Sequence, residues 1–167
     1  MYDKLTEKDI QKIEEEIEYR KLVVRKDTIA AVKEAREQGD LSENFEYYAA
    51  KKEKNRNESR IRYLERMVRT ANIISDDSAE DEVGMNNTVD IYFVDDDETE
   101  TFKIVTTVRE NSLEGRISNE SPIGKAILGH KVGDRVHVKV NDNFGYDVII
   151  KRIENTVDDG TDKMRSY

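Results

Sequence analysis

Two helix-forming segments of about thirty residues each meet at a short turn, which leaves the N-terminal half few ways to fold. The turn is Gly39-Asp40-Leu41-Ser42-Glu43-Asn44-Phe45-Glu46-Tyr47, where a glycine ends one helix and a new capping signal begins the next. On both sides, apolar and small residues recur mostly at spacings of three and four: Ile10, Ile13, Ile17, Val24, Thr28, Ala31 and Ala35, then Tyr47, Ala50, Ile61, Leu64, Val68 and Ala71. This spacing is typical of a coiled-coil seam, and the short turn makes the two helices antiparallel.

The predicted rod has weak points in its seam. A seven-residue gap separates Ile17 from Val24, and Lys54 and Asn57 are polar members of the second helix. Thirty helical residues give a rod of roughly 45 Å. A dimerising coiled coil is the alternative, but the central turn favours an intramolecular hairpin and therefore a monomer.

The chain changes character after the second helix. Residues 1–74 form the predicted hairpin, and residues 75–85 have many turn formers and no seam, which indicates a linker. Residues 86–155 form a second domain, and residues 156–167 are expected to be a flexible tail.

The second domain is predicted to be α+β, with a small antiparallel sheet packed on one helix. Apolar residues alternate with polar ones in four segments, which is typical of half-buried strands: 89–93, 102–104, 136–140 and 146–150. Between them lies one short helix, with Ser121 as N-cap, Pro122 at its first position and Gly129 past its end.

Composition excludes several classes of function. Cysteine is absent, so disulfides and thiolate sites are excluded, and no apolar run is long enough to span a membrane. We therefore expect a soluble, cytoplasmic protein. Residues 1–74 hold 17 Lys+Arg against 16 Asp+Glu, whereas residues 75–167 hold 11 against 21. Because the second domain is acidic, we do not expect the protein to bind duplex nucleic acid by itself.

The turn carries three carboxylates, Asp40, Glu43 and Glu46. Three carboxylates at the exposed tip of a rod suggest that the rod brings them to a site on another molecule. The alternative is local, because Asp40 followed by Glu43 also resembles a helix N-cap arrangement. From the spacing alone, capping is the favoured interpretation.

Two motifs resemble one known family. The first is Gly39-Asp40-Leu41-Ser42-Glu43-Asn44-x-Glu46-Tyr47-x-Ala49-Ala50-Lys51. The second is Gly115-Arg116-Ile117-Ser118-x-x-Ser121-Pro122-Ile123-Gly124-x-Ala126-Ile127-x-Gly129, followed by Lys131-Val132-Gly133-Asp134-x-Val136. In order and spacing they resemble the GreA/GreB family of bacterial transcript cleavage factors, over nearly all of residues 1–153. The chain looks more GreA-like, since its rod is only weakly basic.

The resemblance implies a coiled-coil hairpin followed by an FKBP-like domain. It also implies a partner, bacterial RNA polymerase that has backtracked with its RNA 3′ end in the secondary channel. The globular domain would dock at the channel mouth, and the rod would carry its tip to the active site of the polymerase, which then hydrolyses the RNA. The factor itself would be no enzyme and would hold no cofactor when free.

The resemblance assigns roles to the tip residues. Asp40 and Glu43 would complete the coordination of a catalytic Mg²⁺ of the polymerase, since Mg²⁺ takes oxygen ligands and one or two carboxylates. One of them is also a candidate to orient the attacking water, and Glu46 would support either role from the same helix face as Glu43. The runner-up is a regulator that occupies the channel without stimulating cleavage.

Other residues have both a functional and a plain interpretation. Arg36, Lys51 and Lys52 near the tip would contact RNA phosphates, or they are ordinary solvated charges. Ser121, Pro122 and Ile123 would contact the polymerase, or they simply cap the short helix. Two further classes are a stand-alone prolyl isomerase, for which the strands lack a dense aromatic lining, and a coiled-coil adaptor without a chemical role.

The chain departs from the family at two positions of the tip. Phe45 stands where a small residue is usual, and Tyr48 stands where histidine is common. Residues 95–98 superficially suggest calcium but lack EF-hand spacing, so we expect a solvated hairpin turn. His130 and His137 have no ligand-like spacing and are expected at surface or sheet-face positions.

Overall fold

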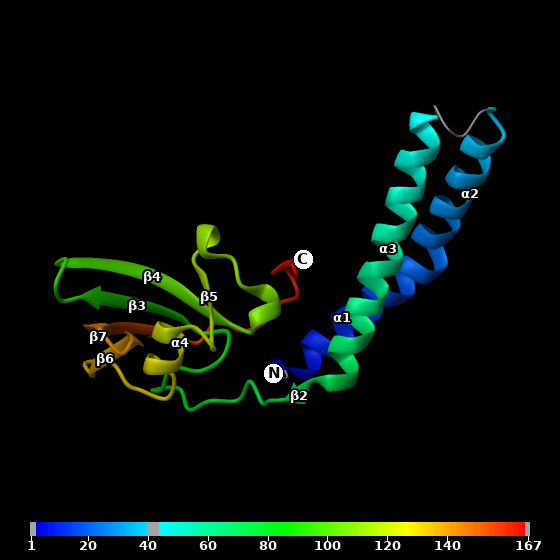
Figure 1. Cartoon of the computed structure of the whole chain (residues 1–167). Coiled ribbons are helices and arrows are strands. Elements are labelled where there is room, and N and C mark those ends of the chain that lie inside the picture. Colours follow the sequence, from blue (N-terminus) through cyan, green and yellow to red (C-terminus); the bar gives the residue numbers. More distant parts are fainter. Residues whose placement is uncertain (1–2, 40–43, 166–167) are drawn as a thin grey trace. The chain divides into compact units, whose positions relative to one another are not determined.

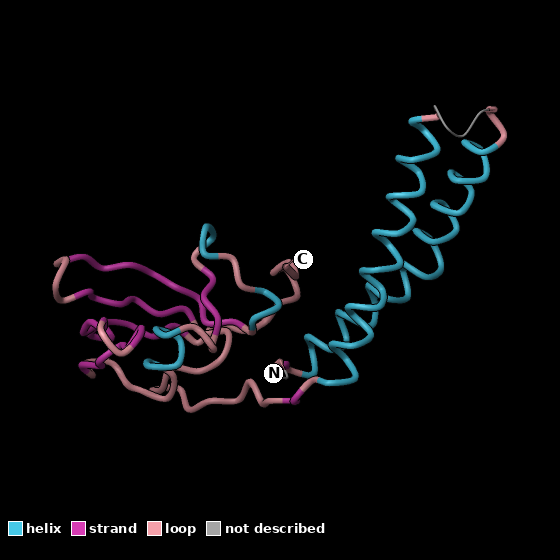
Figure 2. Tube along the Cα trace, viewed as in Figure 1, coloured by secondary structure: helices cyan, strands magenta, loops and turns pink. Residues whose placement is uncertain are grey.

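The computed structural model describes residues 3–39 and 44–165, which divide into two compact units (Figures 1 and 2). The helical unit contains Asp9–Ala71, and the sheet unit combines Lys4–Lys8 with residues from Asn72 onward. None of the helices within the described ranges is long and apolar enough to cross a membrane.

The helical unit is built from two long helical arms. The first arm runs through α1 (Glu7–Tyr19), a π-helix (Arg20–Val24) and α2 (Arg25–Arg36), and the second arm is α3 (Phe45–Thr70). Glu16 accepts a 2.9 Å hydrogen bond from Arg60, whereas Ala35 near the other end of the first arm accepts one from Asn44. The arms therefore run in opposite directions along their interface, as Figure 1 shows for α2 and α3.

The predicted seam lies between the arms. Ile13, Ala35, Ile61 and Leu64 are buried, and Asn57 is buried with them. One assignment is wrong, because Ala31 is exposed and its neighbour Val32 is half-buried instead. Valine has more apolar surface to remove from water than alanine, which favours the observed arrangement.

The π-helix lies where the seam has its seven-residue gap. Its wider turn is closed by the Arg25 backbone N–H, which donates to the Arg20 carbonyl five residues back. Buried Asn57 donates to the same carbonyl at 3.3 Å and accepts from the Arg20 guanidinium at 3.1 Å. The polar seam position on α3 thus faces the irregular turn of the other arm and satisfies its backbone.

The sheet unit is centred on a five-stranded sheet in the order β5-β4-β3-β7-β6. The strands are β3 (Thr88–Phe93), β4 (Glu98–Val105), β5 (Arg116–Ser118), β6 (Arg135–Asn141) and β7 (Phe144–Glu154), and α4 (Pro122–Ile127) contacts β6. A second, two-stranded sheet pairs β1 (Lys4–Leu5) with β2 (Asn72–Ile73) in parallel.

The prediction of an antiparallel sheet is wrong at one edge. Three of the pairings are antiparallel, but β4 and β5 pair in parallel, so the sheet is mixed. The chain between them forms two 3₁₀ turns, Thr107–Arg109 and Ser112–Glu114. A connection of this length lets the chain return beside β4 in the same direction, which a tight hairpin cannot do.

The core of the sheet unit follows the predicted alternation of apolar residues. Val89, Ile91, Val138, Val148 and Ile150 are fully buried, and Ile127 of α4 is buried with them. The predicted linker 75–85 contains no helix or strand, although Val83 and Met85 at its end belong to this core.

Four aromatic rings form a row at the border of the core. Phe93 lies 6.2 Å from Phe102 and 5.8 Å from Tyr146, and Tyr146 lies 6.1 Å from Phe144, between ring centroids. The expectation that the strands lack the dense aromatic lining of an isomerase pocket stays a prediction, because these contacts form a row of rings and do not by themselves define a pocket. The rings come from three strands, and only the register of those strands brings them together.

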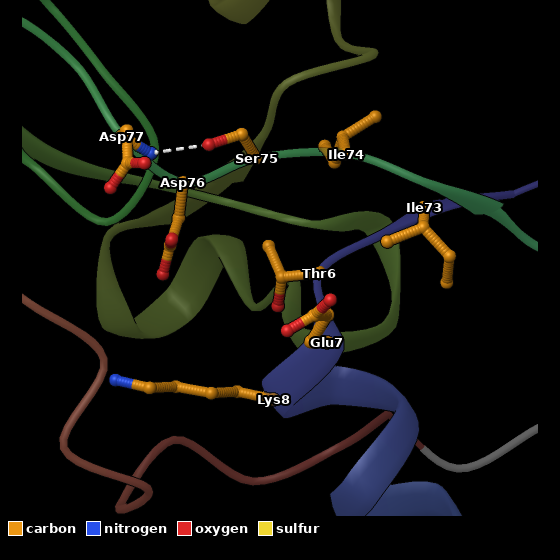
Figure 3. Close-up of a pocket in the computed structure, with 8 residues that line it drawn as sticks. All are labelled: Thr6, Glu7, Lys8, Ile73, Ile74, Ser75, Asp76 and Asp77. Atoms are coloured by element: carbon orange, nitrogen blue, oxygen red, sulfur yellow. Dashed lines mark hydrogen bonds between the residues drawn. The ribbon is translucent and has the colours of Figure 1, made fainter.

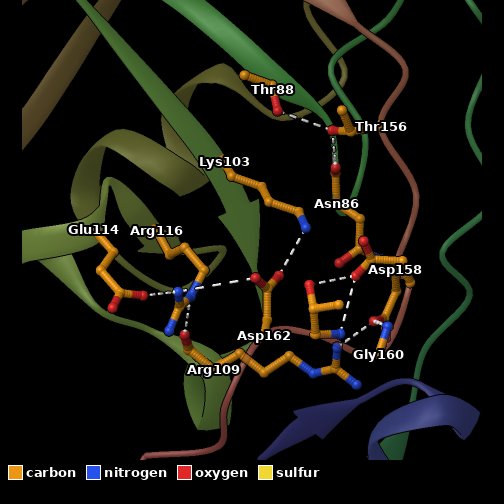
Figure 4. Close-up of polar contacts among 12 residues, drawn as sticks. Asn86, Thr88, Lys103, Arg109, Glu114, Arg116, Thr156, Asp158, Gly160 and Asp162 are labelled. Atoms are coloured by element: carbon orange, nitrogen blue, oxygen red, sulfur yellow. Dashed lines mark hydrogen bonds and ion pairs between the residues drawn. The ribbon is translucent and has the colours of Figure 1, made fainter.

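The described part of the C-terminal segment, as far as Arg165, contacts the sheet unit through polar groups, while its flexibility stays a prediction. Arg109 and Asp158 are 2% and 6% exposed and form an ion pair of 2.5 Å (Figure 4). Lys103 pairs with Asp162 at 2.7 Å, and the Arg165 backbone N–H donates to the Val108 carbonyl. A buried guanidinium needs a charged partner, and the segment supplies it.

Candidate functional site

The tip of the helical unit is defined by the ends of α2 and α3. Helix α2 ends at Arg36, where the Glu37 backbone N–H donates to the Lys33 and Glu34 carbonyls at 3.2 Å each. Gly39 has φ +117°, a conformation that favours glycine. Asp40 and Glu43, the predicted catalytic and metal-binding residues, lie in the range 40–43 outside the described residues.

Asn44 connects the two arms at this end. Its Oδ1 accepts a 3.0 Å hydrogen bond from the Tyr47 backbone N–H, which makes Asn44 the N-cap of α3. Its Nδ2 donates to the Ala35 carbonyl on the other arm at 2.7 Å. Sequence reasoning assigned no role to Asn44, although an asparagine directly before a helix is a recognisable capping signal.

The cap of α3 follows the predicted acidic residues Asp40 and Glu43 directly in the chain. Asn44 is the N-cap of α3, whereas any capping contact of Asp40 or Glu43 lies outside the described residues. Helix α3 begins at Phe45, and Glu43, with which Glu46 was predicted to share a helix face, lies outside the described residues. Glu46 itself is exposed in the first turn of α3.

Two of the predicted cationic residues come together around Tyr47. The Arg36 guanidinium lies over the Tyr47 ring, 5.8 Å from its centroid. A side-chain hydrogen bond from Arg36 lowers the pKa of the Tyr47 hydroxyl, and the charge of Lys51 lowers it further. Arg36 and Lys51 thus flank one ring from opposite arms, and Lys52 is exposed beside them.

An Asn44→Ala variant is expected to lower the free energy of unfolding by about 1–2 kcal/mol, since it loses both the cap and the bond between the arms. Asn44→Asp keeps the acceptor for Tyr47 and loses the donor to Ala35, so we expect about half that loss. Urea unfolding of the full chain measures both, with the exposed Asn55→Ala in α3 as the control. Wild-type stability of Asn44→Ala would contradict the assigned cap.

The predicted partner-binding residues lie at the start of α4. The Ser121 hydroxyl accepts from the Gly124 backbone N–H at 3.1 Å and donates to the Ser118 carbonyl at 2.6 Å. The capping interpretation of Ser121 is therefore confirmed. Pro122 is exposed at the first helical position, whereas Ile123 is half-buried against the core.

The remaining sequence candidates have structural explanations. Asp95, Asp96 and Asp97 lie in the turn between β3 and β4, and Asp97 accepts a 2.6 Å bond from the Tyr92 hydroxyl. His130 contacts Asp134 at 3.1 Å, and His137 contacts Asp147 at 2.7 Å. Among the residues that the structure describes, no three His, Cys, Asp or Glu side chains are grouped to hold a metal.

A pocket in the sheet unit is lined by Thr6, Glu7, Lys8 and residues 73–77 (Figure 3). Its charged groups are mixed, because Lys8 lies among the carboxylates Glu7, Asp76 and Asp77. Lys8 already donates to the Asp158 carbonyl at 3.2 Å. This arrangement favours no particular ligand, so the tip remains the candidate site.

Comparison with protein families gives matches to both units. Residues 4–73 match the family described as "Transcription elongation factor, N-terminal", and residues 72–155 match "Transcription elongation factor, GreA/GreB, C-term". The described segment 156–165 lies beyond both matches.

Individual relatives are similar over most of the chain. The transcription elongation factor GreA of Bacillus licheniformis is 46% identical over 136 residues, which are 81% of this chain and 86% of that protein. GreA of Macrococcus caseolyticus is 43% identical over 150 residues, 90% of this chain and 94% of that protein. Among solved structures, GreA factor homolog 1 of Thermus thermophilus is 27% identical, with a TM-score of 0.43, and covers 93% of this chain and 100% of its own.

Proposed function

Because the chain belongs to the GreA/GreB family of transcription elongation factors, we propose that it stimulates bacterial RNA polymerase to cleave its own backtracked transcript. The observation that carries this proposal is the place of the acidic residues in the chain, between the end of α2 and the Asn44 cap of α3. Asp40 and Glu43 lie in this connection, at the end of the helical unit where Arg36 and Lys51 lie, and we assign the chemistry to these two carboxylates.

We infer that the helical unit is an antiparallel coiled coil that enters the secondary channel of the polymerase, and that the FKBP-like sheet unit docks at its mouth. Support for a stiff rod comes from the polar contacts between its arms. Arg25 and Glu58 form two hydrogen bonds of 2.8 Å, and Glu16 bonds to Arg60. For docking, Ser121, Pro122 and Ile123 are our candidates, because exposed Pro122 is fixed by the capped start of α4.

The chemistry proposed for the tip uses carboxylates as oxygen donors. Mg²⁺ in phosphoryl-transfer sites is usually held by one or two carboxylates together with phosphates and water, so Asp40 and Glu43 are a suitable donor set for a shared ion of the polymerase. Such an ion would stabilise the attacking and leaving oxygens of the displacement. The chain contributes the two carboxylates, with exposed Glu46 in support, and the polymerase remains the enzyme.

The cations near the tip fit the same scheme. Arg36 and Lys51 approach Tyr47 from the two arms, and Lys52 follows on α3. We propose that these cations contact the phosphates of the extruded RNA 3′ end. Contacts of Lys and Arg to phosphate position a nucleic acid without reading its sequence.

Cleavage by the cognate polymerase on a stalled, backtracked complex tests the proposal. We expect shortened RNA and a new 3′ end to form faster with the protein than without it, and no cleavage when polymerase is omitted. Inhibited elongation without faster cleavage would identify the runner-up, a regulator that only occupies the channel.

A prolyl isomerase is the second candidate, because Phe93, Phe102, Phe144 and Tyr146 form an aromatic row in the sheet unit. We do not expect activity from the fold alone. Isomerisation of a proline peptide by the full chain would support this candidate, and loss of that activity in Tyr146→Ala would assign it to the row.

A further inference from the structure

We propose that Phe45 is a stacking platform for an unpaired base of the extruded transcript, an inference that rests on the proposed function. Phe45 is the first residue of α3 and follows the Asn44 cap directly. It is thus only two residues from Glu43 in the chain, at the end of the helical unit where the cations lie.

The exposure of Phe45 is the first observation. Its side chain is 86% exposed, although a ring of this size gains by leaving water. Within the helix, alanine would be a better former at this position than phenylalanine. Neither packing against the residues that the structure describes nor helix formation accounts for the ring, which makes a role in binding the stronger explanation.

The surroundings of Phe45 are the second observation. Tyr48, one helical turn further, is 52% exposed and packs edge-to-face on Tyr47, with ring centroids 5.5 Å apart. Tyr47 is fixed in turn by Arg36 over its ring and by its backbone bond to Asn44. Phe45 is thus the first residue of a helix whose first turn has a side-chain cap and a contact to the other arm.

The combination of rings and cations indicates the class of ligand. Proteins bind single-stranded nucleic acid with aromatic rings that stack on bases and with cations that follow the phosphates. Phe45 and Tyr48 supply exposed rings, and Arg36 and Lys51 supply the charge. A purely apolar surface of a protein partner would explain the rings but not the cations, so RNA is the better fit.

The test combines a variant of Phe45 with a change in the base. A backtracked complex carries 2-aminopurine at the extruded 3′ nucleotide, whose fluorescence falls when the base stacks. Wild-type protein is expected to quench it, Phe45→Trp to quench it as well, and Phe45→Ala to leave it nearly unchanged. The readout does not require cleavage, so it holds even if the proposed function fails.

Cleavage rates then give the size of the effect. At limiting protein concentration we expect Phe45→Ala to slow cleavage by roughly 10-fold, within the range of one base–aromatic stack. On a complex with an abasic 3′ nucleotide, cleavage with the wild-type protein is expected to be slower by a similar factor. On that complex, Phe45→Ala should lower the cleavage rate further by less than about twofold. Tyr19→Ala removes another exposed ring of the helical unit, in α1, and serves as the matched control.

Three outcomes would overturn the inference. One is equal quenching by wild type and Phe45→Ala, and another is no quenching by either protein. The third is a full effect of Phe45→Ala on the abasic complex, which would show that the ring contacts the polymerase and not the base. Quenching by a wild type that fails to stimulate cleavage would reject the proposed function and leave the stacking role standing.

Discussion

The double variant Asp40→Asn, Glu43→Gln is expected to fold normally, to bind RNA polymerase and to lose nearly all stimulation of transcript cleavage. Both changes remove a negative charge and keep the shape of the side chain. Removing a preorganised electrostatic contact from a reacting site costs about 100-fold or more in rate. Because Asn44 caps α3, the helix keeps its capping bond in this variant and stability should change little.

Two measurements together make this prediction decisive. Single-turnover cleavage on a backtracked complex gives the rate, and competition with labelled wild type gives the affinity for polymerase. Glu37→Gln is the matched control, since Glu37 is an exposed carboxylate next to the end of α2. Wild-type stimulation by the folded double variant would refute the chemical role of the two carboxylates.

The helical unit was largely predictable because its periodicity is local. The spacing of Ile13, Ile61 and Leu64 identified residues that the structure buries, and the glycine at 39 marked the end of a helix. The π-helix (Arg20–Val24) also coincides with a sequence feature, the seven-residue gap in the seam between Ile17 and Val24. The bond from Asn57 to the Arg20 carbonyl was not predictable, since it depends on the register between two arms.

The sheet unit was predictable as strands but not as a topology. Alternation identified β3, β4, β6 and β7, whereas β5 has only three residues and its parallel pairing follows from the path of the chain between them. The tail shows the same limit. Its Asp, Lys and Ser content indicates disorder, yet its conformation is decided by Arg109, which lies about fifty residues earlier and needs a buried partner.

At the tip, the sequence predicted the charged residues but not the two hydrogen bonds by which Asn44 joins the ends of α2 and α3. Arg36 and Lys51 were predicted to lie near each other, and both act on Tyr47. The second bond of Asn44, to Ala35, joins residues nine apart across the turn, so no single-helix rule reveals it. The roles of these residues toward RNA stay predictions.

The other large effect is expected in the sheet unit, where Asp158→Ala should lower the free energy of unfolding by about 3–5 kcal/mol. The variant leaves the Arg109 guanidinium buried and without its carboxylate. Asp158 also accepts a 2.9 Å bond from the Gly160 backbone N–H, which is lost as well (Figure 4). Thermal and urea unfolding of the full chain measure the loss.

The pH dependence of stability is an independent test of the ion pair between Arg109 and Asp158. Burial is the largest single influence and would raise the pKa of Asp158. The hydrogen bonds from Arg109 and the Gly160 backbone N–H, together with the charges of Arg109 and Lys8, outweigh it, so the pKa is lowered on folding. The stabilisation is therefore present above the unfolded pKa, about 3.9, and is lost as the pH falls through the lower folded pKa. Asp158→Ala should flatten this acid-side decline of the wild type.

Two further variants separate a buried ion pair from a loosely attached tail. Asp159→Ala removes the neighbouring, exposed carboxylate and is expected to cost less than about 1 kcal/mol. Arg109→Met combined with Asp158→Ala removes both charges, and it should recover part of the stability that Asp158→Ala loses, because no unpaired buried charge remains. If Asp158→Ala unfolds at the same midpoint as Asp159→Ala, the segment is not held by Arg109, which is the result that a flexible tail predicts.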